Sequence, residues 1–422
     1  ALPHVTARAP RAPVDVDLAD TTARQWILSG AREVGRGAVD GPFILPLVTD
    51  GGDGYLAQGF VNIPIGSRAA IRLVGWKRHD PGYIDNVWLG VKGINDEDSY
   101  GGRVLLRLRP TSALTIDGAV YLNRSSTDTP SWTQERGTYK TDARVRLPIR
   151  DKVNLYSGTA VWDLGPVTAT AVLSYMERSL SSIGDTSRFI QNFKTVKGYN
   201  DRCAVNGCSD QLGRPITSYA DYLAYVRPQE TSGLYPRQDM TALTAEVRFS
   251  SNGDGPVNWT VGGFYSLRKT DVDNAQVNMD PVNGRVIEPE QIATQRLIHD
   301  ELKQIAGFAD LSWDVTSKLN LTGGVRYFKY DRDITGQTTV PSILVGARIT
   351  PLTKVGSSED GQVFKANLSY KFTRDLMFYF EAAQGFRPGG VNQVLGLASE
   401  LTPYESDKLW NYEAGIKSSW FD

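Results

Sequence analysis

Residue types that often carry chemistry are scarce in this chain. Its 422 residues include 2 cysteines, 4 methionines and 3 histidines. His4, His79 and His299 lie far apart in the sequence, which favours surface positions over a metal site or a catalytic triad. The sequence also lacks the short motifs of phosphate-binding loops, zinc proteases and serine hydrolases. We therefore predict no catalytic residue, no resident metal and no enzyme activity.

Two further absences limit the classes of partner that we expect for the chain. The chain has 46 Lys+Arg against 47 Asp+Glu, so it lacks the basic excess typical of nucleic-acid binders. No stretch approaches the roughly 18 apolar residues that a membrane helix needs. We expect neither a nucleic-acid partner nor a membrane-spanning helix.

Glycine and aromatic residues are plentiful, with 41 Gly, 19 Tyr and 9 Trp. Apolar and polar residues alternate with a period of two at 114–123, 241–250, 257–268, 318–330, 364–372 and 408–420. Leu319 and Leu321, for example, share one parity, while Asn320 and Thr322 share the other. This period is typical of strands, and no convincing helical period accompanies it. The sequence predicts an all-β fold of roughly 14 antiparallel strands.

The connections between the strands alternate in length after residue 64. Short turns are predicted at 64–68, 109–113, 163–166, 251–256, 314–318 and 372–375. Long polar segments are predicted at 79–98, 124–151, 179–238, 270–298, 333–359 and 386–406. A soluble antiparallel sheet with one wet face would show the same residue parity. Placing every long connection at one end instead favours an outer-membrane barrel, with short periplasmic turns and long extracellular loops.

A membrane barrel gives the two parities a physical meaning. The apolar parity faces lipid and the polar parity faces the lumen, because an arginine or lysine in the lipid-facing midplane costs about 2–4 kcal/mol. Aromatic residues at strand ends are expected to form girdles at the two membrane interfaces. The expected girdle residues are Trp76, Tyr175, Trp259, Tyr327, Tyr379, Trp410 and Trp420.

Four segments resemble known sequences in a consistent order. They are FVNIPIGSRAAIRLVGWKRHDPGYIDNV (60–87), LNLTGGVRYFKYDRD (319–333), FYFEAAQGFRPGGVNQ (378–393) and YESDKLWNYEAGIKSSWFD (404–422). Together they resemble barrel strands of the TonB-dependent outer-membrane receptors. The resemblance implies a barrel of 22 strands, of which this chain would hold a part. We expect 1–54 to be a poorly defined segment leading into the barrel, and 55–422 to be a barrel portion that is incomplete at its C-terminus.

The resemblance also implies a function. Members of this family lie in the outer membrane of Gram-negative bacteria and take up scarce ligands, such as siderophore–iron complexes. The implied partners are outer-membrane lipid, a small-molecule ligand, and TonB with the inner-membrane energising complex, which acts through a plug domain. No cofactor is implied, although the ligand itself can be a metal chelate. Two alternatives stay open, namely a passive porin-like channel and a soluble β-rich binding protein.

Arg387 stands in the run Gly385–Gly390, which can be neither strand nor helix. One interpretation is a solvated residue at the base of a loop, paired with a neighbouring loop. The other places Arg387 at the mouth of the lumen, where it contacts a polar or anionic ligand together with Tyr379, Glu381 and Asn392. Arg326, on the polar parity, is a further ligand-binding candidate.

Cys203 and Cys208 are separated by four residues in the longest connection. Such a pair, in a chain without other cysteines, favours a small disulfide loop in an oxidising compartment. A metal pair is the weaker interpretation, because a structural zinc site needs about four ligands and no histidine lies nearby.

Overall fold

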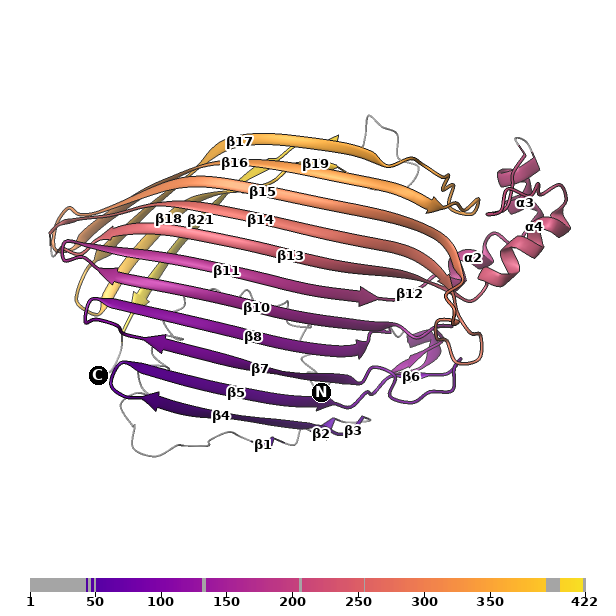
Figure 1. Cartoon of the computed structure of the whole chain (residues 1–422), viewed down its shortest axis with the longest axis horizontal. Coiled ribbons are helices and arrows are strands. Elements are labelled where there is room, and N and C mark those ends of the chain that lie inside the picture. The colour runs from indigo at the N-terminus through magenta and orange to yellow at the C-terminus, as the bar shows by residue number, and fades with distance from the viewer. Residues whose placement is uncertain are drawn as a thin grey trace.

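One large antiparallel sheet dominates the computed structural model of the chain (Figure 1). The structure describes residues 43–44, 47–48, 51–130, 134–204, 207–253, 255–391 and 403–419. Most of the predicted N-terminal segment 1–54 therefore lies outside the described residues. No helix within the described ranges is long and apolar enough to cross a bilayer.

The main path of the sheet follows the order of the chain, as expected when each strand pairs with the next through a hairpin. Its 14 strands are β1 (Phe43–Ile44), β4 (Tyr55–Ile65), β5 (Ala69–Asp80), β7 (Glu97–Leu108), β8 (Leu114–Asp128), β10 (Pro148–Asp163), β11 (Val167–Ser182), β13 (Ser232–Ser251), β14 (Val257–Asn278), β15 (Ile292–Asp314), β16 (Leu319–Val340), β17 (Thr353–Lys371), β18 (Leu376–Arg387) and β21 (Asp407–Ser418). The predicted all-β fold and strand number are confirmed. The sheet curls without closing, so that β1 and β21 lie at its two edges.

The remaining elements belong to the connections. The short strands are β2 (Leu47–Val48), β3 (Gly52–Asp53), β6 (Asp85–Asn86), β9 (Lys140–Thr141), β12 (Gly184–Asp185), β19 (Gly390–Val391) and β20 (Pro403–Tyr404). The helical segments are η1 (Gln134–Arg136), α2 (Ser187–Gln191), α3 (Val196–Tyr199), η2 (Asn200–Ala204), α4 (Tyr219–Val226) and η3 (Arg227–Gln229). The tight turns gather at one end of the strands, and α2, α3 and α4 lie beyond the other end (Figure 1). We call the latter the loop end.

One face of the sheet is apolar along a band of every long strand, and we call this band the belt. Its large exposed side chains include Leu73, Val104, Leu122, Tyr156, Trp162, Leu173, Tyr175, Val247, Phe249, Val261, Ile305, Leu311, Trp313, Leu321, Val325, Tyr327 and Phe364. On β15 the belt runs from Trp313 to Ile305, which is close to the roughly 9–11 residues with which a β-strand crosses a bilayer. The opposite, inward face is polar. It carries ion pairs between Arg107 and Asp117 at 2.6 Å and between Lys365 and Asp310 at 2.9 Å.

The aromatic girdles differ from the prediction in two places. Tyr175, Trp259, Tyr327 and Trp410 lie on the outward parity. Trp76 instead lies inward, where its ring stacks on Tyr121 with centroids 5.6 Å apart and covers Gly101. Tyr379 is also inward and covers Gly415 in the same way. Both rings fill the space that a glycine leaves on the neighbouring strand, which sequence parity alone does not reveal. Trp420 lies outside the described residues.

The strands continue well beyond the belt. The connection predicted at 270–298 is a loop only over 279–291, and that predicted at 333–359 is a loop only over 341–352. Beyond the belt the outward face is no longer a continuous apolar band, so the apolar alternation disappears while the backbone hydrogen bonds continue. The predicted connections were therefore too long.

Candidate functional site

The loop end holds the buried apolar clusters of the described chain. One cluster consists of Val145, Ile183, Ala275, Val277 and Met279, contributed by β14 and by the connections before β10, after β11 and after β14. A second cluster lies in the connection between β11 and β13 and is described below. Apolar residues in the belt can face lipid, but residues beyond it must bury their apolar surface against each other. The loop end is therefore a folded structure and the candidate site of ligand recognition.

Backbone hydrogen bonds join three connections, those between β5 and β7, between β8 and β10, and between β14 and β15. β6 and β9 form a parallel pair, in which the N–H of Asp85 donates to the carbonyl of Tyr139 at 2.9 Å. The N–H of Arg146 donates to the carbonyl of Gly284 at 2.8 Å, which adds the connection between β14 and β15. The buried Asn86 accepts from the N–H groups of Trp88 and Leu89, at 3.0 and 2.9 Å. These bonds make one unit of the three loops.

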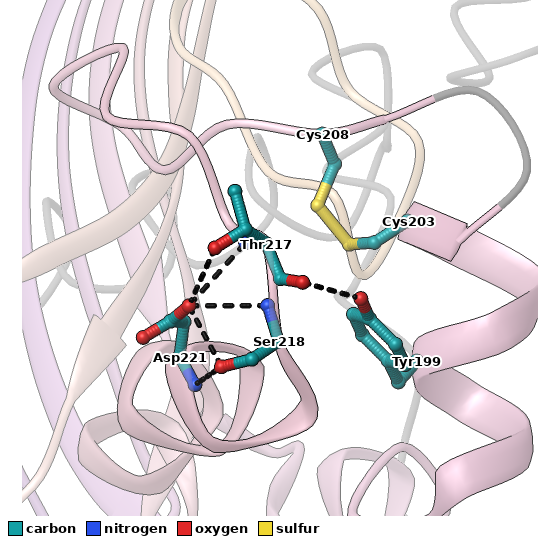
Figure 2. The surroundings of a disulfide bond; sticks show 6 residues. All are labelled: Tyr199, Cys203, Cys208, Thr217, Ser218 and Asp221. Carbon is teal, nitrogen blue, oxygen red and sulfur yellow. Dashed lines mark hydrogen bonds between the residues drawn. A yellow bond between two sulfur atoms is a disulfide. The ribbon is translucent and has the colours of Figure 1, made fainter.

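The connection between β11 and β13 forms a small helical subdomain with its own core. The core residues are Ile190, Cys203, Ile216, Tyr222, Val226 and Leu344. Leu344 comes from the connection between β16 and β17, so two loops far apart in sequence share this core. Cys203 and Cys208 form a disulfide with Cα atoms 4.8 Å apart, next to α3 and α4 (Figure 2).

Hydrogen bonds at the start of α4 tie this helix to the disulfide segment (Figure 2). Ser218 Oγ accepts from the N–H of Asp221 at 3.1 Å, and Asp221 Oδ2 accepts from the N–H of Ser218 at 3.1 Å. This reciprocal pair is a capping box, which satisfies two otherwise free N–H groups. Tyr199 Oη donates to the carbonyl of Thr217 at 3.1 Å. Hydrogen bonds from Ser218 and Thr217 lower the pKa of the Asp221 carboxyl.

The hairpin formed by β18 and β21 packs on the inward face of the sheet. β18 pairs with β17 only as far as Ala383, opposite Lys365, and then continues with β21 alone. Beyond that point Phe386 stacks on Phe328 of β16, with ring centroids 3.7 Å apart and planes 5° apart. The N–H of Gly389 donates to Tyr330 Oη at 2.8 Å. The end of the hairpin is thus seated against β16.

Charged residues surround this contact. Arg332 donates from Nε and Nη2 to Asp300 of β15, both at 2.9 Å, and from Nη1 to Tyr404 Oη at 3.3 Å. Tyr330 Oη donates to Glu359 Oε2 at 2.5 Å, and Ser406 donates to the other oxygen of the same carboxylate. The Arg332 and Asp300 side chains are 18% and 15% exposed, so water screens this pair less than a surface pair. These groups hold the hairpin to the wall of the lumen.

Arg387 is the last residue of β18 and lies opposite Asp407 at the last pair of the hairpin ladder, so the prediction that this run holds no strand is wrong for Gly385–Arg387. Its Nε donates to Asp407 Oδ1 at 3.1 Å, and Nη2 donates to the second carboxylate oxygen. The Arg387 side chain is 79% exposed. The structure therefore shows a solvated residue at the loop base that pairs across its own hairpin. Whether it also contacts a ligand stays a prediction.

The other predicted ligand-binding residues are not gathered around Arg387. Glu381 and Tyr379 lie on β18, about 20 and 26 Å lower along the strand at about 3.3 Å per residue. Tyr379 Oη donates to Glu413 at 2.6 Å. Arg326 lies on β16 with its guanidinium 4.7 Å from the centre of the Phe264 ring. Asn392 lies outside the described residues.

The chain thus forms one curled sheet with a polar inward face and folded loops at one end, and the same features can be sought in known proteins. A family model described as the TonB dependent receptor-like β-barrel matches residues 75–422. The chain belongs to the TonB-dependent receptor family. This family consists of transport receptors rather than enzymes.

Individual TonB-dependent receptors match over different lengths. The pesticin receptor of Yersinia pestis is 32% identical over 173 residues, which cover 41% of this chain and 23% of the relative. The structure of the ferric yersiniabactin uptake receptor FyuA from Yersinia pestis superposes with a TM-score of 0.66 at 16% identity, covering 88% of this chain and 50% of that one. The siderophore receptor PiuA from Acinetobacter baumannii gives a TM-score of 0.60 at 13% identity, covering 92% and 56%. The chain thus spans about half the length of these solved receptors.

Sequence reasoning missed the inward residues that seat the hairpin of this TonB-dependent receptor. Phe328, Tyr330 and Arg332 share one parity and follow each other directly above the belt. A signal was available, because the parity that carries Asn320 and Thr322 within the belt becomes aromatic at Phe328. Aromatic residues on a wet face require a partner, and here the partner comes from 386–389. That long-range contact cannot be read from local periodicity.

Proposed function

We propose that this chain is the barrel portion of an outer-membrane receptor that takes up a scarce ligand, a siderophore–iron complex or a similar nutrient, by TonB-coupled active transport. The observation that carries the proposal is the asymmetry of the barrel. An apolar belt on the outward face is combined with a polar inward face and a folded recognition structure at one end only. A simple pore needs the first two features but not the third.

Family relatives support the ligand class. The solved receptors with similar folds are named for ferric yersiniabactin uptake and for siderophore reception. Ferric chelates are too scarce to rely on diffusion through an open pore, so capture by loops and an energy source are both required. We propose that the energy comes from the inner-membrane complex through TonB, and that no covalent step occurs.

Ligand recognition is assigned to the loop end. The helical subdomain and the three joined loops offer exposed aromatic and cationic groups there, such as Trp88 with the Arg144 guanidinium 4.5 Å from its ring centre. Arginine beside an aromatic ring suits a ligand with both flat and anionic parts, as many iron chelates have. Arg387 lies where the loops of this end leave the strands, and we propose it as a further candidate for contact with the ligand.

Uptake measurements test the proposal against a passive channel. Cells carrying the full-length receptor would be supplied with a panel of ⁵⁵Fe-labelled chelates, with and without TonB and with and without a proton uncoupler. We expect at least one chelate to accumulate only when TonB and the proton gradient are both present. Accumulation that persists without TonB, together with leakage of small sugars from receptor-containing liposomes, would instead identify a passive channel.

A further inference from the structure

Like charges lie directly opposite each other on the outward face above the belt. Arg124 of β8 and Lys152 of β10 are register partners, and Arg150 lies two residues farther along β10. Like charges at opposing positions of neighbouring strands destabilise a sheet. A cluster of this kind suggests that an anion normally lies between the side chains.

Protein carboxylates do not neutralise these cations. Arg124 donates to the carbonyl of Val153 at 3.1 Å and to the side-chain amide oxygen of Asn154 at 2.8 Å, neither of which carries a charge. Within the described part of the chain, neither Arg150 nor Lys152 forms an ion pair with a carboxylate. The nearby Asp151 points to the other face and pairs with Arg178 at 2.7 Å.

The three cations line one groove with a volume of about 450 Å³, together with Arg237, which pairs with Asp273 and Glu290 at 2.7 Å each. Side-chain hydroxyls of Ser126, Ser179 and Ser181 line the same groove and add neutral hydrogen-bonding groups. The other carboxylates that line the groove contact neighbouring protein side chains. Asp239 accepts from Ser179 Oγ at 2.6 Å, and Asp98 lies 3.0 Å from His79 Nδ1.

The height of the groove fits the headgroup layer of a membrane. The outward residues directly below Arg124 and Lys152 are Leu122 of the belt and its register partner Asn154, and Tyr156 of the belt follows Asn154 on β10. Tyr156 and Tyr175 stack with ring centroids 6.4 Å apart, as part of an aromatic girdle at the upper interface. The groove therefore opens just above the acyl chains that the belt would contact.

We propose that this groove binds the phosphate group of an anionic glycolipid in the outer leaflet. A phosphate between Arg124, Arg150 and Lys152 removes their mutual repulsion, and guanidinium groups match its oxygens in geometry and charge. The serines suit the hydroxyls of a sugar headgroup, and the acyl chains would continue downward along Leu122 and Tyr156. The proposal rests on the proposed location in the outer membrane, but not on transport.

Native mass spectrometry of the full-length protein in detergent tests the groove. The probes are lipid A carrying both phosphates, the same lipid without phosphates, and inorganic phosphate as a competitor. We expect the triple variant Arg124→Gln/Arg150→Gln/Lys152→Gln to bind phosphorylated lipid A about 100-fold more weakly than the parent. The matched control Lys303→Gln/Lys329→Gln removes two outward cations at the upper edge of the belt that lie outside the groove. This control should change binding by less than about threefold.

A single variant keeps the test valid if the triple variant assembles poorly. Lys152→Gln should raise the thermal midpoint of lipid-free protein, because it removes a like-charge neighbour of Arg124, and should weaken lipid binding about fivefold. Three results would overturn the proposal. The first is a loss of lipid affinity in the control variant as large as in the triple variant. The second is binding of dephosphorylated lipid A as tight as that of the phosphorylated lipid. The third is displacement of the lipid by equimolar inorganic phosphate. Loss of TonB-dependent uptake with lipid binding intact would contradict the proposed function alone.

Discussion

At the scale of single residues, Gly389 decides whether the β18–β21 hairpin can rest on the inward face. A Cβ atom there would lie 2.7 Å from the Tyr404 carbonyl oxygen and 3.0 Å from the Ser406 nitrogen. The constraint is close packing and does not depend on a positive φ angle, because Gly389 is not among the positive-φ glycines of the described chain. Both contacts are with backbone atoms, which cannot move aside cheaply.

We therefore expect Gly389→Ala to destabilise the folded receptor by about 1–3 kcal/mol, the usual range for overpacking. Gly385→Ala is the matched control from the same stretch, because its Cβ would meet only Leu409 Cγ at 3.8 Å, an ordinary contact. Thermal unfolding followed by gel mobility of unheated and heated samples measures both variants. Equal midpoints for the two variants would show that the hairpin is not seated as described.

Arg387 is the second residue to be tested. Its pair with Asp407 is exposed, and such pairs contribute little to stability because water and salt screen both charges. We expect both Arg387→Ala and Asp407→Ala to assemble normally with nearly unchanged midpoints. Ligand affinity, measured on purified folded receptor, then decides the role of the arginine. A loss of about ten- to a hundredfold for Arg387→Ala alone would establish a charge-assisted ligand contact. Unchanged affinity would leave it as a loop-base residue.

At the scale of elements, α4 depends on its capping box. Hydrogen bonds from Ser218 and Thr217 lower the folded-state pKa of Asp221, so its carboxylate stabilises the helix at pH values above its ordinary pKa. This stabilisation is lost as the pH falls through the lowered pKa. We expect Asp221→Asn to accelerate amide exchange in α4 at pH 7, relative to intrinsic rates. The difference from the parent should shrink below about pH 4. A difference that persists at lower pH would contradict the role of the charge.

The strands allow a sharper test, because Leu321 and Leu368 face each other in register on the outward side. Leu321→Arg and Leu368→Arg each place a charge in lipid at about 2–4 kcal/mol, and we expect both to block assembly in the outer membrane. Asn320→Arg and Asn367→Arg alter the neighbouring inward positions and should be tolerated. Assembly is read from the amount of heat-modifiable receptor in outer-membrane fractions. Equal tolerance at both parities would remove the barrel assignment.

How far the sequence predicts these elements depends on their surroundings. Within the belt, the proposed contact with lipid on one side and with water on the other would impose a strict alternation, so residues 318–330 predict both the strand and its outward side. Above the belt this alternation is lost, and the strand from Asp331 to Val340 looks like a loop in the sequence. The stacking of the Phe386 ring on the Phe328 ring joins residues that lie 58 positions apart in the sequence. No local pattern contains that contact.

At the scale of the whole molecule, each functional statement depends on the chain crossing the outer membrane with its loop end outside. The loop end carries the folded connections, the disulfide and the proposed ligand contacts, whereas the opposite end has only tight turns. An inverted orientation would place recognition in the periplasm, and a location away from the membrane would expose the belt to water at a large cost in free energy.

Labelling of introduced cysteines in intact cells tests this central claim most directly. Leu212→Cys places a thiol at a position that is 77% exposed in the helical subdomain, and Ser317→Cys places one in the tight turn between β15 and β16. The account predicts that a membrane-impermeant maleimide labels Leu212→Cys in intact cells and labels Ser317→Cys only after the outer membrane is permeabilised. Labelling of Ser317→Cys in intact cells while Leu212→Cys stays protected, or equal labelling of both, would contradict it.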